Sequence, residues 1–287
     1  MTRNFSFFYS RGGSGYIRGQ QMAQYLGGKE NPKEGFEDDI CIYVKILPPD
    51  PHPKHTWCDV DDSPKAAEYL KTHPEVGAIA ISETAKDYLN GLLGRNDVIF
   101  IPHQHVNFER RLRPIRPVKT VGIIGSAITA FQSPVEPFRE ELAKMGLELK
   151  FDLDYWNTYK STPEREMRLN VADFYYSMDI QVGFRPRVIF RGMAPFQNPN
   201  KLGNSSAFGI PMVAYPEPSY VREWDGCFVP ARTIEEVLAQ IKRLKDDHLF
   251  YSEIAKKALA RAEDYHIDNV SKLYLQLEKA INNGQPK

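Results

Sequence analysis

Two basic side chains in the second half of the chain, Arg185 and Lys201, follow a predicted strand over residues 178–184. In open α/β sheets, ligands bind outside the carboxyl ends of the strands. Arginine can hold a phosphate through two parallel hydrogen bonds, and lysine can approach it as a point charge. The two residues therefore predict a phosphate site, with solvated surface charge as the alternative interpretation.

The residues around the next predicted strand, 210–215, would extend such a site. Residues 216–219, Pro-Glu-Pro-Ser, interrupt the chain after this strand, and a helix that starts near Ser219 would offer unpaired amide groups to an anion. Asn204 and Ser205 are expected near the phosphates, although both are also common packing residues at helix ends. The pattern predicts a strand, a site loop and a helix in that order.

The first half has a glycine-rich turn directly after its first predicted strand, residues 5–9. Gly13 and Gly15 allow positive φ and a close approach of the backbone to a ligand. The spacing is not G-x-G-x-x-G, which argues against a nicotinamide dinucleotide site. We expect Ser14 to line a ligand site with these glycines and Arg18 to contact a phosphate, although glycine turns at strand ends are common in any α/β fold.

Three side chains of the first half are candidates for taking a proton from a ligand hydroxyl. His105 belongs to a His-x-His segment, and no further cluster of metal-ligand residues accompanies it, so we expect no metal site. Asp59 and Asp61 lie in WCDVDDSP, whose last three residues, 62–64, are typical of a helix cap with proline at the first helical position. The sequence leaves the base open among Asp59, Asp61 and His105.

The composition is that of an ordinary globular protein. The 287 residues include 37 basic and 37 acidic side chains, so nothing in the net charge indicates nucleic acid as a partner. No apolar run approaches the roughly 20 residues of a membrane span, and the N-terminus lacks a signal-peptide pattern, so we expect no membrane span and a cytoplasmic location. Cys41, Cys58 and Cys227 are widely spaced, and we interpret them as small buried residues.

Strand and helix patterns alternate along the whole chain. Apolar runs between helices predict parallel sheets covered on both faces. A basic, proline-marked segment over residues 110–117 is typical of a linker, and after it the pattern of strand, glycine turn and helix starts again, with Gly125 and Ser126 in the second turn. Thr233 and Glu236 form a capping-box pattern at the start of an amphipathic helix.

The run KLGNSSAFGIPMVAYPEPSYVREWDGCFVP, residues 201–230, resembles the donor half of nucleotide-sugar-dependent GT-B glycosyltransferases of the family 4-like group. The family pattern is a lysine, an asparagine, a small-Ala-Gly-x-Pro segment, a strand, and two acidic residues, the second before Asp-Gly. RGGSGYIRG near the N-terminus is similar to the glycine-rich first loop of the family's N-terminal domain. The resemblance covers most of the chain.

The resemblance implies an α/β fold of two Rossmann-like domains facing across a cleft, here residues 1–115 on the acceptor side and 116–287 on the donor side. It also implies that helix amides and basic side chains, rather than a metal, neutralise the donor diphosphate, and that Glu217 and Glu223 bind ribose or sugar hydroxyls. The sequence departs from the family in having Pro-Glu-Pro-Ser where many members have two glycines, and its two glutamates are six residues apart instead of eight.

The expected activity is therefore transfer of a sugar, of the hexosyl type, from a nucleoside-diphosphate sugar to a hydroxyl of a glycan, lipid or small molecule, with no further cofactor. The alternatives are a catalytically silent protein that binds a nucleotide sugar or glycan, and a nucleotide-sugar epimerase on the same scaffold. The expected donor-binding residues are Gly13, Ser14, Gly15, Arg18, Gly125, Ser126, Arg185, Lys201, Asn204, Ser205, Glu217, Tyr220 and Glu223.

Overall fold

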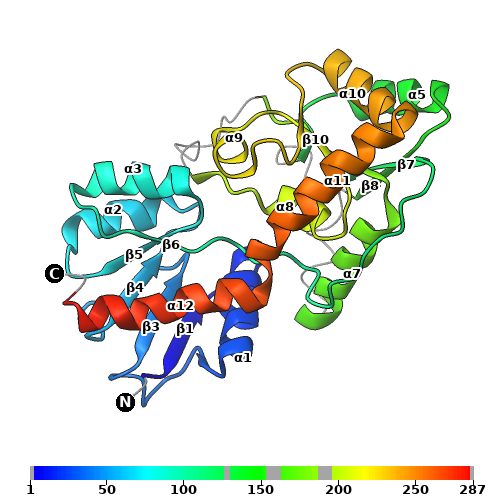
Figure 1. The fold of residues 1–287 in the computed structure, drawn as a ribbon. Coiled ribbons are helices and arrows are strands. Elements are labelled where there is room, and N and C mark those ends of the chain that lie inside the picture. The colour runs from blue at the N-terminus through cyan, green and yellow to red at the C-terminus, as the bar shows by residue number, and fades with distance from the viewer. Residues whose placement is uncertain (1–2, 126–129, 153–162, 187–195, 285–287) are drawn as a thin grey trace. The chain divides into compact units, whose positions relative to one another are not determined.

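The computed structural model describes residues 3–125, 130–152, 163–186 and 196–284. The chain forms two compact units (Figure 1). The first unit contains residues 1–104, 189–198 and 267–287, and the second contains residues 105–188 and 199–266. The division therefore falls eleven residues before the expected boundary at 115, and the C-terminal segment belongs to the first unit instead of the second.

The first unit is built on a six-stranded sheet in which every pairing is parallel. Its strands are β1 (Phe5–Tyr9), β2 (Lys29–Glu30), β3 (Ile40–Val44), β4 (Thr56–Asp59), β5 (Gly77–Ala80) and β6 (Ile99–Phe100). The order β2-β1-β3-β4-β5-β6 reverses direction between β1 and β3. In doubly wound sheets, ligands bind outside the carboxyl ends of the strands at this reversal.

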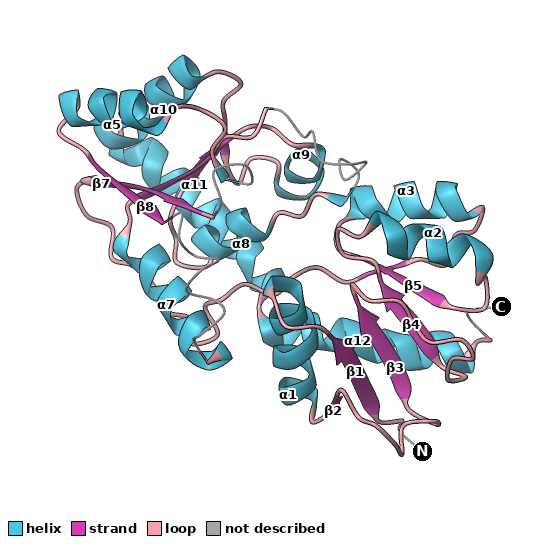
Figure 2. Cartoon of the chain, turned by 180° about the vertical axis from the view of Figure 1, so that it is seen from behind, coloured by secondary structure: helices cyan, strands magenta, loops and turns pink. Residues whose placement is uncertain are grey.

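Helices cover both faces of this sheet. They are the π-helix η1 (Gly15–Gln21), α1 (Met22–Leu26), α2 (Pro64–Thr72), α3 (Glu83–Leu93) and α12 (Ile267–Asn282). Helices α1 and α12 contact each other along one face, and α2 and α3 contact each other along the other (Figures 1 and 2). The expected cap of α2 is confirmed, because the Ser63 side chain accepts a hydrogen bond from the Ala66 amide and Pro64 is the first helical residue.

Helix α12 joins the first unit because its apolar stripe fits this sheet. Ile267, Val270, Tyr274 and Leu277 recur at helical spacing and are all buried. The Tyr274 ring lies 5.7 Å from the ring of Phe7 on β1. The sequence predicts the helix itself, but an amphipathic stripe does not indicate which of two sheets it will cover.

The second unit has a five-stranded parallel sheet in the order β11-β10-β9-β7-β8. Its strands are β7 (Thr120–Ile124), β8 (Glu148–Asp152), β9 (Ile180–Gly183), β10 (Met212–Ala214) and β11 (Val229–Pro230). Its helices are α5 (Val135–Lys144), α7 (Glu164–Ser177), α8 (Asn200–Ser206), α9 (Pro218–Trp224), α10 (Ile234–Asp246), α11 (His248–Ala262) and the short η3 (Glu263–Tyr265). The strand order reverses between β7 and β9, as in the first unit. The sequence prediction of two parallel α/β sheets is confirmed.

Two apolar layers hold the second sheet. Side chains of α5, α10 and α11 pack with the strands in one cluster, which includes Phe138, Ile241 and Tyr251. Side chains of α7 pack with Phe208 and Ile210 in another. Helix α10 begins at the predicted cap, where the Thr233 hydroxyl accepts from the Glu236 amide. The Glu236 carboxylate accepts from the amide of Arg232, one residue before the cap, rather than from the cap itself.

Candidate functional site

An arginine and a glutamate meet at the carboxyl edge of the second sheet. Arg185 follows β9, and Glu217 directly precedes α9, just after β10. Two guanidinium nitrogens of Arg185, Nε and one terminal nitrogen, donate to the two carboxylate oxygens of Glu217. Glu217 is 1% exposed, and the Arg185 side chain is 18% exposed. A bidentate pair of this kind fixes the guanidinium plane at the ligand edge of the sheet.

Lys201, from the first turn of α8, approaches the same edge. A methyl group added to Gly125, directly after β7, would lie 3.2 Å from Lys201 Cε, so the lysine stem passes over this glycine. Gly125 has a φ of 117°, which a side chain would rarely adopt. Burial and the positive charge of Arg185 lower the pKa of Lys201 to about 7, against the opposing effect of Glu217.

Tyr220 in α9 completes what we call the Arg185 cluster: Arg185, Lys201, Glu217 and Tyr220. Its hydroxyl accepts a hydrogen bond from Arg185, and the ring is 1% exposed. Burial and the Glu217 charge raise the pKa of Tyr220, so the phenol stays protonated. The cluster thus holds two basic side chains for one carboxylate, at the strand reversal of a doubly wound sheet. This arrangement can bind an anion.

A second polar group lies at the carboxyl edge of the first sheet. Asp61, two residues after β4, accepts a hydrogen bond from the Ser14 hydroxyl, and its Oδ1 lies 3.0 Å from His103 Nε2. Lys45, just after β3, pairs with Asp62 and lies 4.0 Å from Asp61. Burial alone would raise the pKa of Asp61. The hydrogen bond and charge of His103, together with the charges of Lys45 and Arg18, lower this pKa by a larger amount, so the carboxyl stays ionised.

Arg18 and Asp59 form a separate ion pair beneath this edge. Arg18 Nε donates to Asp59 Oδ2 at 2.6 Å, and Arg18 also donates to the Ile101 carbonyl at 2.9 Å. Both side chains are fully buried. The turn of η1 that carries Arg18 packs tightly on β1, because a methyl group on Gly19 would meet the Tyr9 ring at 2.4 Å.

Several solved structures have the same architecture as this chain. Anabaena HepE in complex with UDP and glucose is 11% identical, with a TM-score of 0.60 over 98% of this chain and 100% of HepE. A glycosyltransferase from Rickettsia africae is 10% identical, with a TM-score of 0.61 over the full length of both chains. A UDP-forming trehalose-phosphate synthase from Burkholderia vietnamiensis is 11% identical, with a TM-score of 0.54 over 85% of this chain and 73% of that one. No family model and no curated protein sequence matches the chain.

The chain has the GT-B fold. At these identities the likeness concerns the fold, and the two sheets correspond to the two Rossmann-like domains of the GT-B architecture. The sequence resemblance to GT-B proteins is thereby confirmed at the level of architecture. The roles of individual residues rest on the geometry of this chain.

The GT-B fold brings some of the predicted donor residues together and separates others. Arg185, Lys201, Glu217 and Tyr220 form the Arg185 cluster, and Gly125 lies against the Lys201 side chain. Ser126 lies outside the described residues.

Glu223 lies in the last turn of α9 and is 8% exposed. It accepts a hydrogen bond from the Tyr265 hydroxyl at 2.8 Å. Asn204 and Ser205 lie in the second half of α8 rather than at a helix start. Asn204 accepts from the Val106 amide, and Ser205 donates to the Leu202 carbonyl, so their positions are explained by local hydrogen bonds.

The glycine loop of the first GT-B unit differs in detail from its prediction. Gly12, with a φ of 141°, makes the turn, while Gly13 and Ser14 already begin the helical segment. Gly15 is required by close packing, since a methyl group there would lie 2.0 Å from the Ser10 carbonyl oxygen. Arg18, predicted to contact a phosphate, is instead buried against Asp59, which is thereby withdrawn as a free base.

His105 is the base candidate whose surroundings in the structure differ most from the prediction. It belongs to the second unit, where its amide donates to the Tyr265 carbonyl and its Nδ1 accepts from the Asn107 amide at 3.2 Å. Burial, assisted by the charge of His266, lowers its pKa to about 3. The ring lines a cavity of about 220 Å³ with Leu259 and Ala262 among its walls. His105 is a neutral histidine that already accepts a backbone hydrogen bond.

Sequence reasoning missed two polar residues of the first unit, His103 and Lys45. The sequence signal for His103 was present, because this residue is the first histidine of the His-x-His segment that follows β6. The prediction named His105 instead, which lies further into the loop. Among the residues that the structure describes, no group of three or more His, Cys, Asp or Glu side chains is arranged to hold a metal ion. In the described ranges, every helix is too short or too polar to cross a bilayer.

Proposed function

We propose that this protein is a glycosyltransferase that uses a nucleoside-diphosphate sugar, and that the second unit binds the donor. The observation that carries the proposal is the Arg185 cluster at the strand reversal of the second sheet. A diphosphate is a compact anion, and a planar guanidinium with a neighbouring lysine is suited to bind it. The GT-B fold supports this reading, since HepE has the same architecture and was solved with UDP and with UDP-glucose.

The roles within the site follow from charge. Lys201 and Arg185 would bind the diphosphate, and their positive charges would stabilise the negative charge that develops on the leaving group as the sugar bond breaks. When the diphosphate binds Arg185, Glu217 has to give up one of its two hydrogen bonds with this arginine. The freed carboxylate oxygen can then accept a hydrogen bond from a hydroxyl of the nucleotide sugar. These side chains supply the neutralising charge themselves, so the proposal includes neither a metal nor a further cofactor. The acceptor is a hydroxyl compound.

A thermal-shift panel of UDP, GDP, ADP, TDP and their sugar conjugates tests donor binding directly. A ligand that binds only the native state raises the melting temperature, and saturation to about 100 times Kd adds roughly 2.7 kcal/mol of stability. A shift with one nucleotide family fixes the donor class. The proposal would be contradicted if none of these nucleotides or sugar conjugates raised the melting temperature.

Turnover separates this proposal from the two alternatives of the sequence. Release of free nucleoside diphosphate that depends on an added acceptor indicates a transferase. Saturable binding without turnover indicates a silent binding protein, and interconversion of the bound sugar indicates an epimerase. The conjugate that gives the largest thermal shift is the substrate for this assay.

A further inference from the structure

A pocket in the second unit is lined, in the described part of the chain, by residues outside the Arg185 cluster. Its volume is about 220 Å³. Its lining comes from three segments of this unit: the loop over residues 105–112, Ala207 directly after α8, and residues 259–263 at the end of α11 and the start of η3. We call it the His105 pocket. A cavity of about 150 Å³ is large enough to bind benzene, so this pocket can hold a substituted ring.

Hydrogen bonds fix the loop of the His105 pocket against η3 and α8. The His105 amide donates to the Tyr265 carbonyl at 2.9 Å. Asn107 is fully buried, and its side-chain amide group donates to the carbonyls of Ala207 and Arg111 at 2.8 and 2.9 Å. The wall is therefore already formed in the structure, and a ligand would not have to order it.

Among the described residues, one ring nitrogen of His105 has no hydrogen-bond partner. Nδ1 accepts from the Asn107 amide at 3.2 Å, so in the neutral ring the proton is on the other nitrogen, Nε2. His105 is 4% exposed, but Nε2 is not among the fully covered polar atoms that lack a partner. Since the ring lines the His105 pocket, this N–H can donate to a molecule bound there.

The remainder of the lining is apolar or already paired. Arg110 and Glu263 form an ion pair at 2.7 Å, and both side chains are about half exposed. Burial, assisted by the charge of His266, lowers the pKa of His105 to about 3, so the ring is neutral near pH 7. The lining therefore has no net charge. Its apolar wall consists of Leu112, Ala207, Leu259 and Ala262.

We propose that the His105 pocket binds a small uncharged molecule that has an apolar body and one carbonyl oxygen. The oxygen accepts the hydrogen bond from His105 Nε2, and the apolar body lies against the leucine and alanine wall. A carboxylate is disfavoured, because Glu263 belongs to the same lining and already pairs with Arg110. The site goes beyond the proposed sugar transfer and does not depend on it.

The test uses three probes that differ in one group each. Fluorine NMR titration of the full chain measures binding of para-fluoroacetophenone, of para-fluoroethylbenzene, which lacks the oxygen, and of the ionised para-fluorobenzoate. His105→Phe keeps an aromatic ring but removes the donor. The loss of one neutral hydrogen bond should weaken binding of the ketone about three- to tenfold, whereas para-fluoroethylbenzene should keep its affinity. An equal loss for both probes would overturn the hydrogen bond to His105.

Leu112→Asp is a second variant that leaves His105 in place. Leu112 is 58% exposed, so the chain should fold, which circular dichroism checks. The aspartate replaces an apolar contact with a hydrated charge, so both uncharged probes should bind about fivefold more weakly. Ile115→Asp is the matched control, because Ile115 lies in the same linker, is 51% exposed and is not part of the pocket lining. It should leave binding of every probe unchanged.

Three results would overturn the proposal. Unchanged binding of both uncharged probes in Leu112→Asp would place them outside the His105 pocket. Tighter binding of para-fluorobenzoate than of the ketone would make the ligand an anion. A wild-type protein that binds none of the probes would remove the site itself, whatever the nucleotide panel shows, since donor binding is measured separately.

Discussion

Asp179 and Glu217 are two buried carboxylates of the second unit, and each contacts arginine, but they lie at opposite edges of the same sheet. Asp179 directly precedes β9, at the amino edge, whereas Glu217 follows β10, at the carboxyl edge. They are 0% and 1% exposed. Burial and an arginine partner are therefore shared by the two sites, and they do not distinguish a structural site from a functional one.

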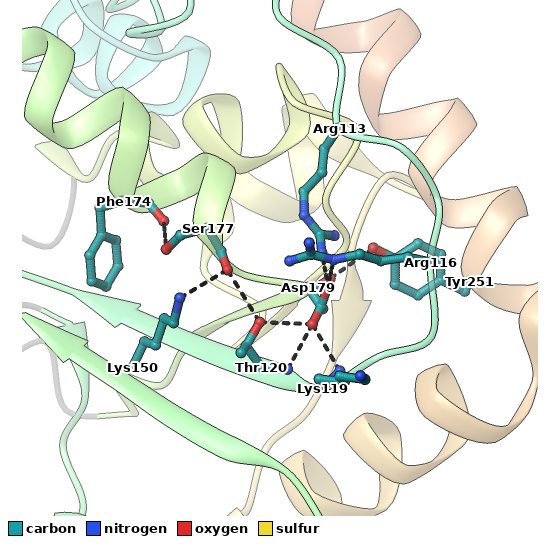
Figure 3. A network of polar contacts seen from close by, with 9 residues as sticks. All are labelled: Arg113, Arg116, Lys119, Thr120, Lys150, Phe174, Ser177, Asp179 and Tyr251. Carbon is teal, nitrogen blue, oxygen red and sulfur yellow. Dashed lines mark hydrogen bonds and ion pairs between the residues drawn. The ribbon is translucent and has the colours of Figure 1, made fainter.

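Asp179 is surrounded by donors on every side (Figure 3). Its Oδ2 accepts from the Lys119 amide at 2.8 Å and from the amide and hydroxyl of Thr120, both at 2.7 Å. Its Oδ1 contacts Arg113 and lies 3.1 Å from Arg116 Nε. We call these five residues the Asp179 cluster. It ties the segment before β7 to the start of β9, and its acceptor capacity is used by the protein itself.

Glu217 differs in how the neighbouring cations are paired. Both clusters have two cationic side chains near one carboxylate, but Arg113 and Arg116 both contact Asp179, whereas no hydrogen bond or ion pair of Lys201 is found among the described residues. The comparison teaches that a basic side chain without a pairing partner, together with the edge of the sheet, indicates where a ligand can bind. We expect substitutions in the Asp179 cluster to change stability and substitutions in the Arg185 cluster to change donor binding.

The largest expected effect is that of Asp179→Asn on stability. The neutral amide leaves the buried Arg113 without its counter-charge, and breaking a buried ion pair by removing one partner costs about 3–5 kcal/mol. Urea unfolding followed by circular dichroism measures this loss. Asp173→Asn is the control, because Asp173 pairs with Arg111 at an exposed position and should cost less than about 1 kcal/mol. If the two variants lost equal free energy of unfolding, the Asp179 cluster would contribute no more to stability than an exposed ion pair.

Arg185→Ala should act mainly on donor binding. Loss of a charge-assisted contact to the diphosphate should weaken binding by about 1–3 kcal/mol, measured by titration calorimetry with the nucleotide that the thermal-shift panel selects. Arg139→Ala provides the comparison, since this arginine pairs with Glu136 on the exposed side of α5. An unchanged binding constant in Arg185→Ala would remove this residue from the donor site, and with it the proposed contrast between the two edges.

Lys201 gives the Arg185 cluster a pH dependence that the Asp179 cluster should lack. A bound diphosphate favours the charged lysine, so binding near pH 8 should take up a proton, and the affinity should fall as the pH rises above about 7, by up to about tenfold per pH unit. Calorimetry in buffers with different ionisation enthalpies measures the proton uptake, and Lys201→Met should abolish it. Proton uptake that persists in Lys201→Met would assign the effect to another group.

The same lysine affects the pH dependence of folding with a defined sign. Its folded pKa of about 7 lies below its usual value of 10.5, so the folded state binds fewer protons between these values. Stability should therefore rise with pH across this window, while below pH 7 the cost of burying the charged form is fully present. Lys201→Met should flatten this part of the profile in urea unfolding. A rise of the same size in the variant would contradict the assignment.

The alternation of strands and helices was predictable from the sequence because each long element carries its own periodicity. The predicted first strand, residues 5–9, coincides with β1, and the amphipathic helix predicted to start at Thr233 is α10. Strand β4 was missed, since Thr56–Asp59 is short and stands between prolines and aspartates that indicate a loop. That omission matters for the site, because β4 places Asp59 and Asp61 at the carboxyl edge of the sheet.

The candidate site was predictable in part. Arg185 and Lys201 were found because they follow a strand, and the parallel sheet does bring them to one edge. Whether a polar side chain is available or occupied depends on partners distant in sequence, such as Asp59 for Arg18 and His103 for Asp61. Periodicity carries no information about such pairs, so Arg18 was predicted at a phosphate and His103 was passed over.

The smallest effect expected is that of Thr233→Ala, which calibrates the comparison. The Thr233 hydroxyl caps α10, and losing an N-cap typically costs about 1 kcal/mol of stability. In the part of the chain that the structure describes, Thr233 has no hydrogen bond or ion pair with either cluster. Donor affinity should therefore not change, and the stability loss should add to that of Asp179→Asn within about 0.5 kcal/mol. Urea unfolding of both single variants and the double variant measures this sum. If the double variant lost markedly less stability than the sum of the two single variants, Asp179→Asn would already have loosened α10. Its effect would then reflect partial unfolding of the unit rather than one broken ion pair, and the contrast with the Arg185 cluster would have to be drawn from binding data alone.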